Sequence, residues 1–248
     1  MYIQDDGIRL NAKLDKPAGA DRCPVVVVIH GFTGHMEERH ITAVCETLNG
    51  MGFATLRADM YGHGHSDGEF RKHTLYKWLT NAMTLIDYAR RLDFATEVYL
   101  CGHSQGGLTA ILAAALKRDQ ISGLIALSPA NMIPELSRRG ELLGARFDPN
   151  HIPETLPTWG DEVLDGNYIR VAQTIHVEEA IDQYDGPVLI VHGDADDAMP
   201  VQCGIDAAKR YKDAKLVIIP GDSHCYDHHL DQMLAAVKDW MEPRLTRE

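Results

Sequence analysis

The chain lacks the features of proteins that bind nucleic acids or membranes. Lys and Arg never stand more than two in a row, and 36 acidic residues outnumber 24 basic ones, for a formal net charge of −12. A groove that follows phosphates needs clustered positive charge. The apolar run from Pro24 to Ile29 is far shorter than the ~20 residues of a membrane-spanning helix. We therefore expect no nucleic-acid partner and no membrane partner.

Cysteine is scarce and scattered. The sequence has five cysteines and no Cys-x-x-Cys pair, which argues against both a disulfide framework and a zinc knuckle. The first residues, from Met1 to Asp6, have neither the basic region nor the apolar core of a signal peptide. These absences predict buried thiols in a cytoplasmic protein.

The sequence does contain a regular alternation of β-rich runs and helical periods. Hydrophobic residues make up 45% of the 248 positions and charged residues 24%, as in an ordinary globular chain. The β-branched run Val25–Ile29 is typical of a strand buried on both faces, whereas the alternation from Ile8 to Leu14 is typical of a strand with one wet face. Further strands are predicted at 53–58, 97–101, 123–127, 187–191 and 216–219, separated by helices. The pattern predicts an α/β fold with a mostly parallel central sheet and helices on both faces.

One interval interrupts this alternation. Between Ser128 and Pro187 the sequence is rich in proline and has no strong strand pattern, but it contains too much Leu, Ile and Trp for a flexible linker. The strand pattern resumes at Pro187, so neither half of the chain could close a sheet alone. We predict one domain over 1–248, with a cap or lid inserted at about 130–185.

A candidate nucleophile stands between a predicted strand and a predicted helix. The segment Gly102-His-Ser-Gln-Gly-Gly107 is a Gly-x-Ser-x-Gly nucleophile elbow in the strand–turn–helix setting that this motif requires. Such a turn raises the Ser104 hydroxyl above the sheet at a helix N-terminus, where developing negative charge is favoured. We therefore predict that Ser104 is a catalytic nucleophile.

A serine hydroxyl needs a histidine base and a carboxylate that orients it. After the strand at 187–191 comes His192-Gly-Asp-Ala-Asp-Asp-Ala-Met-Pro200, which offers Asp194, Asp196 and Asp197. After the strand at 216–219 comes Pro220-Gly-Asp-Ser-His224, with His228 and His229 further on in the following helix pattern. Both loops leave the same sheet edge as Ser104, so the side chains can converge.

With these residues, the sequence resembles the α/β-hydrolase superfamily over essentially its whole length. The family's acid loop, Gly-x-x-Asp-x-x-x-Pro, places the acid at Asp196, and its base, the first histidine after the last strand, is His224. Two backbone N–H groups would bind the oxyanion. The resemblance assigns one to Gln105, which follows the nucleophile, and the other to Phe32 in the His-Gly loop after the strand at 25–29.

Within that superfamily the sequence most resembles bacterial cinnamoyl and feruloyl esterases. The resemblance is carried by segments 30–35, 56–64, 102–107, 167–173 and 221–229. It implies a serine carboxylic-ester hydrolase that releases hydroxycinnamic acids from plant-derived esters and holds the aromatic acyl group in an inserted subdomain. That subdomain offers Trp159 and Tyr168 as aromatic partners and Glu135 as an acceptor for a phenolic hydroxyl. The partner is then a small aromatic ester, and a homodimer is compatible with the family.

Three alternatives remain. A monoacylglycerol-lipase-like enzyme or a broad carboxylesterase has the same triad and elbow, although the charged interval 132–182 is polar for an interfacial lid. A non-catalytic ligand-binding protein of this fold is the third, but such proteins commonly lose a triad member.

The segment His63-Gly-His-Ser-Asp67 is similar to part of a metallo-β-lactamase-type metal motif, but Gly68 stands where that motif needs a histidine. We predict no metal and no cofactor.

Overall fold

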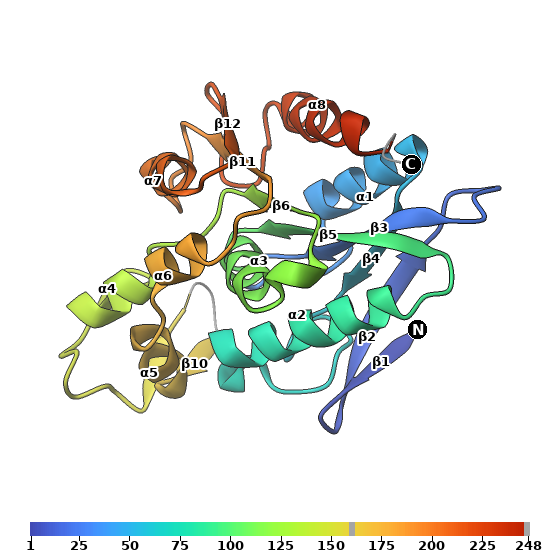
Figure 1. Cartoon of the computed structure of the whole chain (residues 1–248). Helices are drawn as coiled ribbons and strands as arrows, with labels where there is room; N and C mark the ends of the chain where they lie inside the picture. Colours follow the sequence, from blue (N-terminus) through green and yellow to red (C-terminus); the bar gives the residue numbers. More distant parts are fainter. Residues whose placement is uncertain (159–161, 246–248) are drawn as a thin grey trace.

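An eight-stranded sheet forms the centre of the structure, a computed structural model that describes residues 1–158 and 162–245 (Figure 1). Its strand order is β1-β2-β4-β3-β5-β6-β11-β12. β1 and β2 run antiparallel to their neighbours, and all the pairs from β4 to β12 are parallel. The strands span Tyr2–Asp5 (β1), Ile8–Asp15 (β2), Cys23–Ile29 (β3), Ala54–Ala58 (β4), Ala95–His103 (β5), Gly123–Leu127 (β6), Val188–Gly193 (β11) and Ala214–Ile219 (β12).

Five longer helices cover the sheet. They are α1 (Arg39–Met51), α2 (Leu75–Arg90), α3 (Gln105–Leu116), α7 (Gln202–Arg210) and α8 (Leu230–Met241). α1 and α8 pack against each other on one face of the sheet, and α2 and α3 on the other (Figure 1). Short 3-10 helices occur at Phe70–Lys72 (η1), Arg118–Gln120 (η2) and Glu242–Arg244 (η3). The predicted α/β class, with helices on both faces, is confirmed.

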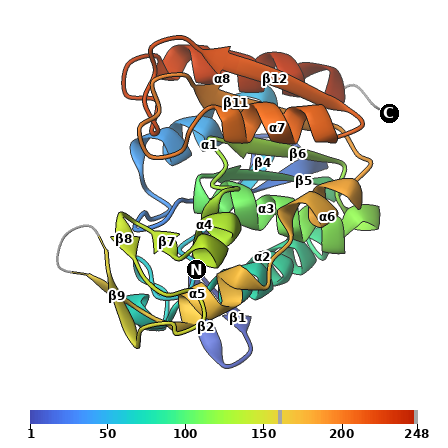
Figure 2. The ribbon, with the colours of Figure 1, turned by 90° about the vertical axis from the view of Figure 1, so that its left-hand side faces the viewer.

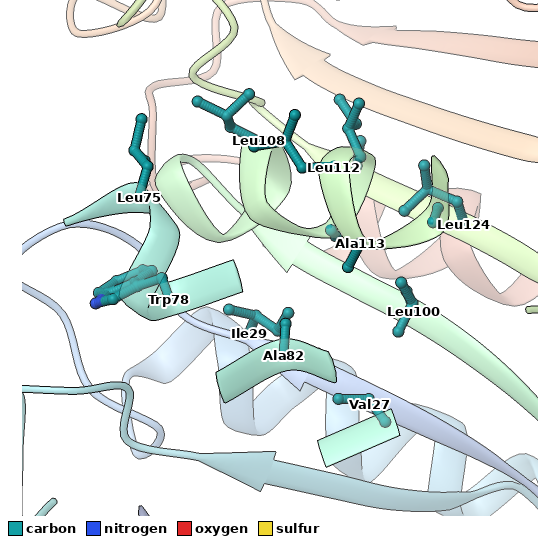
Figure 3. Packing of buried hydrophobic residues seen from close by; sticks show 14 of the residues in the cluster. Val27, Ile29, Leu75, Trp78, Ala82, Leu100, Leu108, Leu112, Ala113 and Leu124 are labelled. Atoms are coloured by element: carbon teal, nitrogen blue, oxygen red, sulfur yellow. The ribbon is translucent and has the colours of Figure 1, made fainter. Parts of the chain in front are cut away.

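The β-branched run in β3 explains why both faces are covered. Successive side chains of a strand point to opposite faces. Val27 and Ile29 accordingly lie in the apolar cluster beneath α2 and α3, with Trp78 and Leu100 (Figure 3). Val26 and Val28 lie in the other cluster, beneath α1 and α8. Residues 25–29 are all at most 1% exposed, so β3 is buried on both faces.

Between β6 and β11 the chain leaves the sheet and forms the segment at about 130–185, hereafter the cap segment. It contains α4 (Ile133–Arg139), α5 (Asn167–Gln173), α6 (Val177–Asp182) and the two-stranded pairs β7–β8 (Glu141–Leu142, Ala145–Arg146) and β9–β10 (Thr155–Pro157, Val163–Asp165). α6 packs on α3 and α5 on α2, so the cap segment lies on the α2–α3 side of the sheet (Figure 2). An ion pair between Arg71 and Asp165 joins it to the loop after β4. Across the described ranges, no helix has the length and apolar character needed to cross a bilayer.

Candidate active site

Ser104 occupies a sharp turn between β5 and α3. β5 ends at His103 and α3 begins at Gln105, which leaves Ser104 alone at the corner with φ 56° and ψ −120°. A positive φ is uncommon for a residue other than glycine and signals local strain. The turn is possible because a Cβ at Gly102 would overlap the backbone of Gly106, and one at Gly106 would overlap the His30 carbonyl. The elbow glycines thus allow β5, α3 and the loop after β3 to meet around Ser104.

Asp196 and His224 meet at the ends of two neighbouring strands. Asp196 Oδ2 lies 2.7 Å from His224 Nδ1, and Asp196 Oδ1 accepts backbone N–H groups from Ala198 at 3.0 Å and Met199 at 2.7 Å. A carboxylate can only accept, so Nδ1 of His224 carries a proton, and in the neutral ring Nε2 has the lone pair. That tautomer is the one a general base requires.

The environment of Asp196 keeps it ionised. Its side chain is fully buried, and burial alone raises the pKa of a carboxyl. Hydrogen bonds from His192 and His224 and from the Met199 backbone outweigh burial and hold the pKa of Asp196 well below its usual value. Of the two neighbouring candidates, Asp194 accepts the Gly221 N–H at 2.6 Å, and Asp197 lines a cavity that Ser104 and His224 share.

Ser104 and His224 line one cavity of about 460 Å³. Phe32, Tyr168 and Asp197 share its wall, and the cap segment supplies an apolar side through Ile133, Leu136, Leu142 and Leu143. This size and lining are typical of a site for a small, largely apolar molecule with a few polar anchors. The cavity thus brings a nucleophile, a base and an apolar wall together.

The two expected oxyanion donors flank the nucleophile. Gln105 is the first residue of α3, so its N–H has no acceptor within the helix. Phe32 follows Gly31, where a Cβ would lie 3.1 Å from the Ser104 Cβ, so this loop passes close to the serine. The assignment of both N–H groups to an oxyanion stays a prediction.

The three cap-segment residues predicted to bind substrate have different positions. Tyr168 lines the cavity and is 1% exposed; its hydroxyl donates to Gln105 Oε1 at 2.6 Å, and burial raises its pKa. Trp159 lies outside the described residues. Glu135 is absent from the cavity wall. Its carboxylate pairs with Arg138 and Arg139 beside a separate depression between α4, α6 and α7, so its placement gives no support to a role with a phenolic hydroxyl.

One further sequence expectation differs from the structure, and the possible metal motif can be placed. His228 and His229 precede α8, which begins at Leu230, instead of lying within it. In the possible metal motif, Asp67 pairs with Arg9 at 3.0 Å, whereas His63 packs against Trp78 with ring centroids 4.9 Å apart. The side chains of Asp67 and His63 therefore contact different residues.

Sequence reasoning missed His192. Its Nε2 lies 3.1 Å from Asp196 Oδ2 and 2.9 Å from the Met199 carbonyl, and the side chain is fully buried. His192 therefore contacts the same carboxylate oxygen of the acid as His224 does. The only signal was its position as the first residue after the buried run 187–191, which does not distinguish a packing residue from a functional one.

The sheet order, the elbow and the Asp196–His224 contact are the features of an α/β-hydrolase. The family model described as serine aminopeptidase, S33, matches residues 20–170, and the chain belongs to this family. It is similar over its full length to the solved structure of Est1E from Butyrivibrio proteoclasticus with ferulic acid bound. That similarity is 59% identity at a TM-score of 0.98, with 100% of each chain covered.

More distant relatives are a palmitoyl-protein thioesterase and a lipase. Human mitochondrial palmitoyl-protein thioesterase ABHD10 is 26% identical over 199 residues, covering 76% of this chain and 62% of the relative. Human monoglyceride lipase is 28% identical over 149 residues, covering 58% of this chain and 47% of the lipase. The chain thus spans about three fifths, or less, of the length of these curated relatives.

Proposed function

We propose that this protein is a serine carboxylic-ester hydrolase that releases hydroxycinnamic acids, ferulic acid among them, from their esters. The observation that carries the proposal is the single cavity that joins Ser104 and the Asp196–His224 pair to an apolar wall from the cap segment. The likeness to Est1E, whose structure contains ferulic acid, supports the same acyl group for this chain.

In the proposed reaction, Ser104 Oγ attacks the ester carbonyl while Nε2 of His224 takes its proton. The carbonyl oxygen becomes an oxyanion, and the N–H groups of Phe32 and Gln105 stabilise it. Collapse of this intermediate breaks the ester C–O bond, and the alcohol leaves with the proton from His224. Water, deprotonated by His224, then attacks the acyl-enzyme and releases the acid and Ser104. Asp196 remains ionised throughout and holds the imidazole.

We further propose that the chain is one α/β-hydrolase domain and that the cap segment selects the acyl group. Tyr168 is the residue best placed for this role, because it lines the cavity and its ring packs near Phe32, with centroids 6.2 Å apart. An edge-to-face cluster of this kind offers a flat surface to an aromatic acyl group. Trp159 remains part of the proposal as a second aromatic partner.

A substrate panel tests the proposal. We expect kcat/KM for methyl ferulate and methyl caffeate to exceed that for p-nitrophenyl butyrate by about tenfold or more, because the aromatic acyl group packs against the apolar side of the cavity. Comparable values would favour a broad esterase, and a preference for monoacylglycerols would favour a lipase. In the same assay Ser104→Ala should lose about 10⁶-fold in kcat and all labelling by a fluorophosphonate. Labelling that persists at another serine would overturn the assignment of the nucleophile.

A further inference from the structure

Three potential metal ligands from distant parts of the chain meet beside His224. They are His40 in α1, His103 at the end of β5 and Cys225, which follows the candidate base. One ligand atom from each lies within 4.8 Å of the other two. His40 and His103 are each 3% exposed, whereas Cys225 and His103 also line the cavity. The cluster is therefore buried on one side and reachable from the cavity on the other.

The hydrogen bonds define the state of the two imidazoles. His103 Nε2 lies 2.9 Å from the carbonyl oxygen of His224, so this nitrogen must carry a proton and donate it. Burial lowers the pKa of His103 well below its usual value and that of His40 to about 4, so both rings are neutral near neutral pH. A bare His103 Nδ1 then accepts from His40 Nε2 at 3.0 Å. Both rings thus have the neutral form that metal binding requires.

His103 has the surroundings of a metal-binding histidine. Such a histidine typically donates its other ring N–H to a backbone carbonyl or a carboxylate, which fixes the tautomer and aims the free nitrogen. The bond from His103 Nε2 to the His224 carbonyl does this, and it leaves Nδ1 directed at the cluster. Burial, together with nearby Glu38 and Asp227, raises the pKa of Cys225 to about 11. The same negative charges favour a cation.

We propose that His40, His103 and Cys225 form a binding site for a zinc-class divalent cation, and that its occupancy inhibits ester hydrolysis. Two imidazoles and one thiolate suit Zn²⁺, with the fourth position open to water from the cavity. Tetrahedral ligands at about 2.0–2.3 Å from the metal lie about 3.5 Å apart. The two imidazole nitrogens, 3.0 Å apart, must therefore separate slightly, and the Cys225 sulfur must approach them by up to roughly 1 Å. On binding, the Cys225 thiol releases its proton to solvent. The His40 proton moves from Nε2 to Nδ1, which leaves Nε2 free to coordinate.

The inhibition rests on the proposed function, because it acts through His224. Cys225 adjoins His224 in the chain, and His103 Nε2 donates a hydrogen bond to the carbonyl oxygen of His224. When Cys225 moves toward the metal, the adjoining His224 imidazole moves relative to Ser104. A displacement of about 1 Å at a reacting group costs on the order of 10²-fold in rate.

Co²⁺ serves as the probe, because a thiolate ligand gives it an intense near-ultraviolet charge-transfer band and tetrahedral geometry gives it strong visible bands. We expect the metal-stripped protein to show both on addition of Co²⁺. Zn²⁺ should remove the bands by competition and inhibit hydrolysis of methyl ferulate, and EDTA should reverse the inhibition. Absence of the thiolate band in the wild-type protein overturns the site, whatever the activity shows.

Matched variants separate this site from adventitious binding at His224 or the surface. Cys225→Ser and His40→Gln should each raise the Zn²⁺ concentration for half-inhibition by about tenfold or more, measured against each variant's own metal-free rate. The control His228→Gln removes an exposed imidazole and should behave as wild type. Unchanged inhibition in Cys225→Ser overturns the proposal. A thiolate band in a protein that hydrolyses no ester leaves the metal site standing and rejects the proposed function alone.

Discussion

At the residue scale, the orientation of His224, the candidate base, depends on one of the three carboxylates in the loop after β11. Asp196→Asn should lower kcat by about 10⁴-fold, because an amide cannot hold His224 in the required tautomer. Asp194→Asn is the matched control, since its amide oxygen can still accept the Gly221 N–H. We expect that variant to stay within a few-fold of the wild type. Steady-state rates with methyl ferulate measure both. A loss in Asp194→Asn as large as that in Asp196→Asn would reject Asp196 as the acid.

The residues that sequence could assign are those whose chemistry needs a fixed spacing. Ser104 follows from its motif and setting, whereas Asp196 and His224 follow from the acid loop and the base position of the family that the sequence resembles. Glu135 could not be placed, because the cap segment has no strand period to fix a direction for its side chains, and two arginines engage it. The His40–His103 pair unites residues far apart in the chain, and no local pattern signals such a contact.

At the element scale, close backbone approach determines where α3 begins. The sequence predicts this helix over 108–117, where alanine and leucine, both strong helix formers, predominate. The structure begins it at Gln105, immediately after the elbow. The difference has a tertiary cause: the glycines let the first turn of α3 pack against the backbone of the loop after β3. The buried parallel strands were easier to predict, because their β-branched runs are both long and local.

Gly106→Ala tests this packing. A Cβ at Gly106 would overlap the backbone oxygens of Ile29 and His30, which cannot move without shifting β3. We expect the free energy of unfolding to fall by about 1–3 kcal/mol or more. The matched control is Gly50→Ala in α1, where a Cβ meets nothing within 4 Å. That variant should gain about 0.5–1 kcal/mol. Urea unfolding measures both, and equal effects would contradict a steric role for Gly106.

At the scale of the whole molecule, the parallel strands bring distant loops to one edge. β3, β5, β11 and β12 are followed by the segments that carry Phe32, Ser104, Asp196 and His224, respectively. Because the carboxyl ends of parallel strands share an edge, these segments meet although they come from the whole length of the chain. The same edge holds a second feature, three buried histidines around Trp78: His30, His63 and His73.

These three histidines should make stability depend on pH. Burial is the main cause that lowers the pKa of His30 and His73 to about 3 and that of His63 to about 4. In the unfolded chain each protonates near pH 6.5. Between about pH 6.5 and pH 4 the unfolded state therefore binds more protons, and stability falls as pH falls. Each group contributes about 1.4 kcal/mol per pH unit to that slope.

A single substitution isolates the contribution of one ring. His63 Nε2 has no hydrogen-bond partner among the described residues, whereas Nδ1 donates to the Tyr61 carbonyl at 3.0 Å, a bond that glutamine can replace. His63→Gln should therefore reduce the slope of unfolding free energy against pH by about 1.4 kcal/mol per unit between about pH 6 and pH 4.5. His65→Gln, at an exposed position of the same loop, should leave the slope unchanged. Urea unfolding across this range gives both slopes, and identical slopes would show that His63 is already protonated in the folded protein.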